Sequence, residues 1–367
     1  MAVLDQEGPG QDIGARAASR AELPAWLRGI HPVAWLLALF LLFVPAFAND
    51  FIQFQIFGWS FVLGMIALSL MFLAGYGGMV SLVQMTVAGV AAYMSAIFGS
   101  SAMETISLFW PWWIAVPIAL AIAVAFGTIS GALAVRTEGI YTIMITLAIA
   151  AAFFYLTLQN YALFNGFSGF NALRAPVIFG IDFHDATPFY YLSLFFAALS
   201  FFVVLYVSRS PFGLALQGVR DNARRMEAIG FNVTAHRIAA YAFAALIAAI
   251  AGILLTWQNG QVSPGTAGIG PVIDILVIAV IGGLSHPIGP FIGALIYALL
   301  RTFAIDLLQG VGLDPARFNL LIGLGFLAIV FFSPDGIIGL WKRWRNSRSA
   351  TSLARAAGRR VSGEGDG

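Results

Sequence analysis

Apolar runs long enough to cross a lipid bilayer recur along this chain. A transmembrane helix needs roughly 20 mostly apolar residues, because the hydrocarbon core of a bilayer is about 30 Å thick. Runs near this length cover residues 33–48, 55–74, 80–98, 112–135, 140–158, 188–207, 238–257 and 318–332. The chain is therefore predicted to be an all-α, polytopic membrane protein.

Residues 270–300 form a further apolar stretch that is too long for one span. Gly282, Gly283 and Pro287 interrupt it, and each half is shorter than an ordinary span. Two interpretations remain open: two short helices that both cross, or a broken hairpin that re-enters the membrane. The second is tolerated only where protein shields the backbone or a cavity is lined. With this pair included, we expect about ten transmembrane segments.

Composition agrees with a membrane protein and excludes several kinds of site. Hydrophobic residues make up 60% of the chain and charged residues only 10%, whereas soluble domains contain about 25% charged residues. No cysteine is present, which excludes disulfides, thiolate nucleophiles and cysteine-ligated metals. The four histidines are at least 50 residues apart, so we expect no metal site.

The chain also lacks the motifs for nucleotide hydrolysis or for hydrolysis inside the membrane. A P-loop needs Lys followed by Ser or Thr in a Gly-rich loop, but the one lysine, Lys342, is followed by Arg343. The spans carry neither a Ser-His-Asp arrangement nor an HExxH motif. We therefore expect no enzyme activity and no cofactor in this chain, so any ATP must be hydrolysed by a separate polypeptide.

Basic residues are distributed unequally between the two predicted sides of the membrane. If the N-terminus is cytoplasmic and the spans are followed in order, 16 of the 19 Lys and Arg residues lie in cytoplasmic segments. Arg174, Arg301 and Arg317 are the exceptions. This asymmetry follows the positive-inside rule and predicts that both termini are cytoplasmic.

A membrane domain between two polar ends is the predicted organisation. Residues 1–32 are expected to be a polar cytoplasmic segment, 33–340 the transmembrane domain, and 341–367 a basic, disordered cytoplasmic tail. The first apolar run ends in Ala46-Phe47-Ala48, which resembles a signal-peptidase site. Its flank is too long and too mixed in charge for a signal peptide, so we favour an uncleaved first span.

A charged segment, residues 209–232, lies between two of the apolar runs and is predicted to be an amphipathic helix. Ser210 and Pro211 suit the helix start, and Gly230 suits the position just past its end. Asp221 and Arg225 have the spacing of an i,i+4 ion pair. The apolar stripe recurs every three or four residues, at Phe212, Leu216, Val219, Ala223 and Met226.

Two interpretations of this helix compete. In the first, the helix lies on the lipid headgroups with its arginines toward anionic lipid. In the second, its apolar stripe packs on the membrane domain while its polar face contacts a soluble partner. The residues resemble the cytoplasmic coupling loop of the M-type permease subunit of bacterial branched-chain amino acid ABC importers. The matching runs are Arg209-Ser210-Pro211-Phe212-Gly213, Arg220-Asp221-Asn222 and Glu227-Ala228-Ile229-Gly230.

Other segments resemble the same family, in the same order along residues 63–343. They are residues 75–84, 136–148, 165–169, 281–293 and 333–341. Phe167 and Ser285 stand where the family has glycine, and the change at Ser285 leaves the local backbone conformation in question. The resemblance implies a coupling loop over residues 208–236. Its implied ATPase-coupling residues are Arg220, Asp221, Arg224, Glu227, Ala228 and Gly230.

Candidates for the translocation pathway are Gln84, Thr146, Asn165 and Asp274. Asp274 is the one acid clearly within an apolar run, and a charge at mid-membrane costs about 3 kcal/mol. In one interpretation Asp274 has a functional role at mid-membrane. In the other it lies at the outer interface, one turn from Pro271, and caps a helix while solvated. Both interpretations remain open.

The resemblance implies a permease subunit of an ABC importer for branched-chain or related amino acids, in the bacterial inner membrane. Implied partners are a second, H-type permease, two ATPase subunits that use ATP and Mg²⁺, and a periplasmic solute-binding protein. The lipid bilayer surrounds the membrane domain. No nucleic-acid partner is expected. The alternatives are a sister ABC system for urea or short amides, and an ion-coupled secondary transporter with Asp274 as its proton site.

Overall fold

A computed structural model of the chain describes residues 39–103, 105–137, 139–178 and 180–310, together with Gly323 and Gly336. The predicted N-terminal segment, most of the predicted last span and the basic tail lie outside the described residues. The chain divides into two compact units, Met1–Val44 and Pro45–Gly367. Apart from η1, which begins at Val44, every element described below lies in the second unit.

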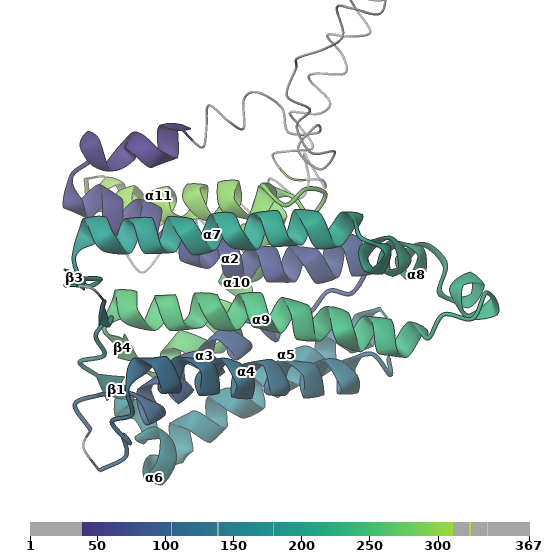
Figure 1. Ribbon diagram of the computed structural model, residues 1–367, viewed down its shortest axis with the longest axis horizontal. Coiled ribbons are helices and arrows are strands. Elements are labelled where there is room, and N and C mark those ends of the chain that lie inside the picture. Colours follow the sequence, from purple (N-terminus) through teal and green to yellow (C-terminus); the bar gives the residue numbers. More distant parts are fainter. Residues whose placement is uncertain are drawn as a thin grey trace, which may run out of the picture. The chain divides into compact units, whose positions relative to one another are not determined.

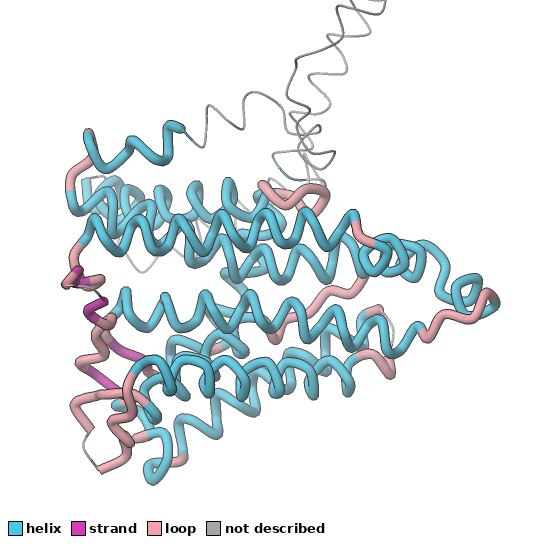
Figure 2. The backbone as a smooth tube through the Cα atoms, in the orientation of Figure 1, coloured by secondary structure: helices cyan, strands magenta, loops and turns pink. Residues whose placement is uncertain are grey.

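The described part of the second unit is almost entirely helical, with four two-residue strands (Figures 1 and 2). Five of its helices are long and apolar enough to cross a membrane. The first is a continuous helix built from η2 (Ile52–Gly58), α2 (Trp59–Met71) and η3 (Phe72–Tyr76), in which η2 and η3 are π-helical. The other four are α4 (Trp112–Ala134), α5 (Ile140–Gln159), α7 (Ala186–Arg209) and α9 (Val233–Asn259). These helices confirm the all-α, polytopic membrane fold.

Three further apolar helices are shorter or lie next to breaks in the backbone. They are α3 (Gln84–Phe98), α10 (Ile269–Gly282) and α11 (Gly289–Gly310). The remaining elements are η1 (Val44–Ala46), α6 (Tyr161–Phe164), η4 (Gly166–Ser168), α8 (Pro211–Ala228) and η5 (Pro264–Ala267).

The predicted span 80–98 is wrong at its start, because the helix begins only at Gln84. Residues 78–83 form an irregular segment, in which Gly78 has a φ of +67°. Most of this segment is buried, and the Leu82 N–H donates to the Thr146 Oγ1 of α5 at 3.1 Å. Irregular backbone at membrane depth needs such protein partners, since lipid offers none.

Helix α9 is the core of the bundle and packs against α2, α3 and α4 (Figure 1). Its buried face is built mainly from small residues, including Ala244, Ala248, Ala251 and Gly252. Small side chains let helix backbones approach closely, which replaces the hydrophobic driving force that is missing between helices in lipid. The closest approach is at Gly252, where an added Cβ would lie 2.6 Å from the Ala88 Cα of α3.

The bundle has two distinct ends (Figure 1). One end carries the strands, in which β1 (Phe170–Asn171) pairs antiparallel with β4 (Gln261–Val262) and β2 (Val177–Ile178) pairs with β3 (Ile181–Asp182). The opposite end carries α8 and the turn that connects it to α9. These are called the strand end and the α8 end below.

Helices α10 and α11 form a hairpin, which bears on the interpretation left open for residues 270–300. The 14 residues of α10 rise about 21 Å, which is less than the ~30 Å of a hydrocarbon core. Gly283 ends α10 with a φ of +103°, and the backbones of Gly282 and Gly289 are in contact across the turn. The turn packs against Gly75, the second-last residue of the first long helix, so the hairpin extends to the end of that span and both interpretations stay open.

The contact between α3 and α9 predicts a test of stability. Gly252→Ala places a methyl group against the Ala88 backbone, which cannot move as a side chain can. We therefore expect the free energy of unfolding to fall by about 1–3 kcal/mol. Gly270→Ala is the matched control, because it is also a helical glycine but has open space at the Cβ position. The thermal unfolding temperature of the purified protein in detergent should fall for Gly252→Ala and stay equal or rise for Gly270→Ala. Equal unfolding temperatures would show that the crossing is not closely packed.

Candidate functional site

Helix α8 begins and ends as the sequence predicts. Ser210 is extended and its Oγ accepts a hydrogen bond from the Gly213 N–H at 3.4 Å, while Pro211 occupies the first helical turn. At the other end, Gly230 has a φ of +93°, a conformation that glycine adopts without steric cost. Its N–H and that of Phe231 bond back to the carbonyls of Glu227 and Met226, which closes the last turn.

The prediction of one regular helix is wrong at its centre. Asn222 has non-helical angles, φ −159° and ψ +92°, and its Oδ1 accepts a hydrogen bond from the Arg225 N–H at 2.9 Å. Asn222 therefore caps a second short helical stretch, as asparagine does at helix N-termini. The break also prevents the predicted pair between Asp221 and Arg225, because that pair requires an unbroken helix. Asp221 instead pairs with its neighbour Arg220 at 2.9 Å.

One face of α8 is anchored to the bundle, as the apolar stripe predicts. Leu216 and Val219 are 0% and 1% exposed, and Phe212, Ala223 and Met226 are half-buried. The Gln217 Nε2 donates to the Ser208 carbonyl of α7 at 2.9 Å. On the other side, the ring of Phe212 stacks on His236 of α9 at 5.7 Å between centroids. The helix is therefore held by the two long helices that flank it.

Arg220 connects α8 to the end of the first long helix. Its Nη1 donates to the Gly75 carbonyl of η3 at 2.5 Å, and its Nε donates to Asp221. Its aliphatic stem covers Gly78, where an added Cβ would lie 2.6 Å from the Arg220 Cγ. The carbonyls of a final helical turn have no partner within the helix, so the guanidinium satisfies one of them. Arg220 thus links α8 directly to the start of the irregular segment.

The other predicted coupling residues lie on the outer face of α8. Asp221 ends the first helical stretch, and Arg224, Glu227, Ala228 and Gly230 belong to the second stretch and its terminal turn; all of them are exposed. In Figure 1 this second stretch projects away from the long helices. The helix thus has a face fixed to the bundle and a charged face that the bundle leaves open.

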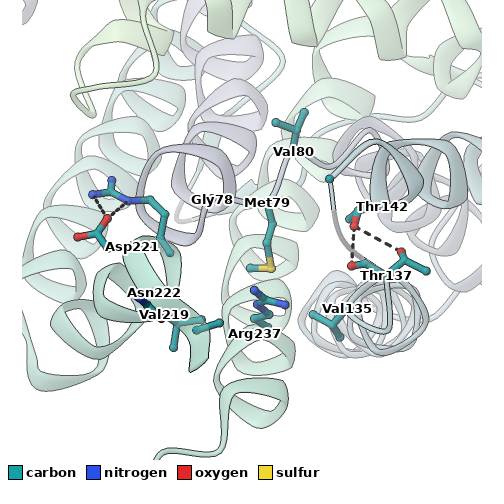
Figure 3. Close-up of a pocket in the computed structure, with 13 residues that line it drawn as sticks. Gly78, Met79, Val80, Val135, Thr137, Thr142, Val219, Asp221, Asn222 and Arg237 are labelled. Atoms are coloured by element: carbon teal, nitrogen blue, oxygen red, sulfur yellow. Dashed lines mark hydrogen bonds and ion pairs between the residues drawn. The ribbon is translucent and has the colours of Figure 1, made fainter. Parts of the chain in front are cut away.

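A cavity of about 280 Å³ opens beside α8 (Figure 3). In Figure 3 the side chain of Met79 points toward Arg237 of α9, and Thr137 and Thr142 lie across the view from Asp221. Thr142 is anchored by a 2.9 Å bond from its Oγ1 to the Thr137 carbonyl. The lining residues come from the irregular segment, the α4–α5 turn, α8 and α9: Gly78, Met79, Val80, Val135, Thr137, Gly139, Thr142, Val219, Arg220, Asp221, Asn222, Ala223 and Arg237.

The structure brings together the pathway candidates Gln84 and Thr146 around the irregular segment. Thr146 is 0% exposed and accepts from the Leu82 N–H, while the Gln84 Oε1 accepts from Ser69 at 3.2 Å. Gln84 is 1% exposed, and its Nε2 has no hydrogen-bond partner among the described residues. A buried amide donor left unpaired is costly, so this position carries a polar group that packing alone does not explain.

The other two pathway candidates lie elsewhere. Asn165, at the strand end, has left-handed backbone angles, and its Nδ2 donates to the Gly169 carbonyl at 2.6 Å, which closes the loop before β1. Asp274 lies in the second turn of α10, whose N-terminal cap is Gly268. The interpretation of Asp274 as a helix cap is therefore wrong. It is half-buried and lines a separate cavity together with Tyr297 and Arg301.

Sequence reasoning missed the partners of these residues more than the residues themselves. Nothing in the sequence joins Arg220 to the Gly75 carbonyl, because backbone groups carry no sequence signature. The spacing of Tyr297 and Arg301 by one helical turn was the available signal on α11, but their meeting with Asp274 depends on how α10 and α11 pack.

Within the described ranges, no group of three or more His, Asp or Glu side chains is close enough to hold a metal ion.

Comparison with known proteins gives consistent relatives. The chain is 24% identical over 217 residues to the high-affinity branched-chain amino acid transport system permease protein LivM of Salmonella typhimurium, covering 53% of this chain and 51% of that protein. It is 26% identical over 171 residues to the corresponding protein BraD of Pseudomonas aeruginosa, covering 46% and 54%. It is also 24% identical over 256 residues to the ribose import permease protein RbsC of Haemophilus influenzae, covering 67% and 76%.

The chain thus spans about half the length of the first two of these relatives. No solved structure matches it. The profile of the family described as "branched-chain amino acid transport system / permease component" matches residues 52–330, which is well over half of the chain and includes every element from η2 to α11. The chain belongs to this family of transport permeases.

Proposed function

We propose that this protein is a permease subunit of an ABC importer for branched-chain or related amino acids. The observation that carries the proposal is the two-faced geometry of α8. One face is fixed to the bundle by Leu216, Val219 and the Arg220–Gly75 bond, and the other presents exposed charge at one end of the bundle. A helix so arranged can transmit force from a soluble partner to the membrane segments.

The arginine distribution supports placing the α8 end in the cytoplasm of a bacterium, at the inner membrane. Arg209, Arg220, Arg224, Arg225 and Arg237 lie in or beside α8, whereas at the strand end the described arginines are Arg174 and Arg301. Positive charge is retained on the cytoplasmic side of a bilayer. In this orientation two ATPase subunits, which use ATP and Mg²⁺, bind α8, a solute-binding protein meets the strand end, and an H-type permease lies alongside.

The substrate class is the finer part of the proposal. The family description and the relatives LivM and BraD are named for branched-chain amino acids, whereas RbsC is named for ribose. We favour the amino acids because the family profile covers most of the bundle. Urea or short amides, ribose, and ion-coupled transport without ATP are the outcomes against which the proposal is tested.

The complex should be purified with its partner subunits and reconstituted into liposomes with ATP inside. We expect ATP-dependent uptake of L-leucine that requires the binding protein, with little uptake of urea, acetamide or ribose. Uptake of urea or ribose in place of leucine would overturn the substrate class. Uptake that persists without ATP and stops when the proton gradient is collapsed would overturn the ABC assignment itself.

Charge reversal on the outer face of α8 should disrupt the partner contact. Glu227→Arg changes an exposed residue and leaves the anchored face intact, so the protein should insert normally. Unfavourable charge pairing at an interface costs several kcal/mol, so we expect at least about tenfold less ATPase to co-purify. Asp185→Arg, an exposed charge reversal at the strand end, should leave co-purification unchanged. A helix that only lies on lipid predicts no loss, since added positive charge favours anionic headgroups.

Removing the Arg220 link should separate binding of the ATPase from transport. Arg220→Gln deletes the bond to the Gly75 carbonyl, and a hydrogen bond to a charged group is worth about 1.5–3 kcal/mol. We expect the ATPase to co-purify at the normal level while leucine uptake falls roughly tenfold. Arg136→Gln, which changes an exposed guanidinium that follows α4 and lies outside α8, should keep full uptake. Normal uptake by Arg220→Gln would show that the link does not transmit motion.

A further inference from the structure

A second cavity, of about 260 Å³, extends inward from the strand end. It is bounded by the end of α9, by η5 and by the hairpin of α10 and α11, and the first turns of α2 and α3 complete its wall. Its volume is slightly below the ~300 Å³ at which sites for drug-sized ligands begin. The cavity is therefore suited to a single small solute.

Two opposite charges face this cavity. Asp274 of α10 is half-buried, and the hydroxyl of Tyr297 and the guanidinium of Arg301, both on α11, are its polar neighbours. Arg301 lies over the ring of Trp59, with 5.0 Å from its Cζ to the ring centroid. This cation–π contact orients the guanidinium, because the face of an indole ring attracts a cation.

Apolar side chains form the rest of the wall. Leu63, Met85, Leu255 and Ile275 line the cavity, together with the ring of Trp59. A cavity that carries one acid, one guanidinium and an aliphatic surface matches one ligand chemistry well. A zwitterionic amino acid has an ammonium group, a carboxylate and, in its aliphatic members, a branched apolar side chain.

We propose that this cavity binds an aliphatic α-amino acid as its zwitterion. Asp274 accepts hydrogen bonds from the ammonium group, Arg301 donates to the carboxylate, and the side chain packs on Leu63, Met85 and Ile275. The proposal rests on the proposed function, whose substrate class it deepens, and it places recognition in the permease itself. Urea and sugars lack both charges, so they cannot form either of these charge-assisted contacts.

The position of the cavity fits such a role. Met85, on its wall, follows Gln84 at the start of α3, and Gly78, Met79 and Val80 line the cavity beside α8. The irregular segment thus lines the cavity beside α8, and Met85, in the first turn of the helix that follows it, lines the other. An amino acid held at the strand end would lie next to the segment that Arg220 links to α8.

The test is binding of radiolabelled L-leucine to the intact complex in nanodiscs, without binding protein. Asp274→Asn and Arg301→Gln each remove one charge and keep much of the side-chain volume. We expect each to weaken leucine binding at least about tenfold, or about 1.4 kcal/mol. The matched controls are Asp185→Asn and Arg174→Gln, the same changes at exposed strand-end residues, and they should bind leucine normally.

Ligand analogues assign each charge to its partner. 4-Methylpentanoate lacks the ammonium group, and leucinamide lacks the carboxylate. Asp274→Asn should weaken leucine binding without weakening that of 4-methylpentanoate, and Arg301→Gln should weaken leucine binding without weakening that of leucinamide, because each variant removes a charge that repels the analogue. If a charge variant does not fold, the unmodified complex still decides: leucine must bind at least about tenfold more tightly than either analogue or ribose.

Several results would overturn the proposal. They are equal binding of leucine by the charge variants and the controls, an equal affinity of the unmodified complex for leucine and its analogues, and no leucine binding in the absence of binding protein. If any of these occurs while the reconstituted complex still imports leucine, this site fails and the proposed function stands. If the complex imports ribose or urea and not leucine, the proposed function fails.

Discussion

Every backbone polar group at membrane depth must find a partner within the protein, because lipid supplies none. Two irregular segments of this chain are enclosed by protein. In residues 78–83 the Leu82 N–H bonds to Thr146, and the turn after α10 packs against Gly75, where an added Cβ would clash with the Leu284 carbonyl oxygen. Both depend on close helix packing, which the small residues of α9 allow at crossings such as Gly252 on Ala88. The irregular segment before α3 and the turn between α10 and α11 are thus both stabilised by the surrounding helices of this bundle.

The same pair of breaks converges on one point, the end of the first long helix. Gly75 covers the hairpin turn on one side, and its carbonyl accepts the Arg220 guanidinium of α8 on the other. Gly78, three residues later, lies under the stem of Arg220. A displacement of α8 would therefore be transmitted directly to the irregular segment, through the Arg220–Gly75 hydrogen bond and the contact of the Arg220 stem with Gly78. No chain of intermediate residues is needed.

The irregular segment and the first turn of α3 lie between α8 and the cavity at the strand end. Residues 78–80 line the cavity beside α8, Met85 of α3 lines the other, and Gln84 between them is buried with an amide donor that has no partner among the described residues. Irregular backbone has fewer internal hydrogen bonds to break than a regular helix, so it can change conformation at lower cost. The proposed coupling through α8 would act on this segment first, through Arg220.

The sequence alone determined the class of protein, most helix positions, and the ends of α8. Apolar run length, the Ser210–Pro211 start and the Gly230 end are local signals, and the structure agrees with them. The break at Asn222 was not predicted, because the apolar stripe continues through it and the competing interaction is a side-chain cap. The sequence also named Asp274 and Arg220 without their partners.

Tertiary structure alone decided those partners. The Gly75 carbonyl lies 145 residues before Arg220, and Asp274 meets Arg301 only because α10 and α11 fold into a hairpin. Which faces of two helices meet depends on the packing of every side chain between them. Local sequence reports propensity and periodicity, so it determined which residues are polar in an apolar setting, and the packed bundle determined what each of them touches.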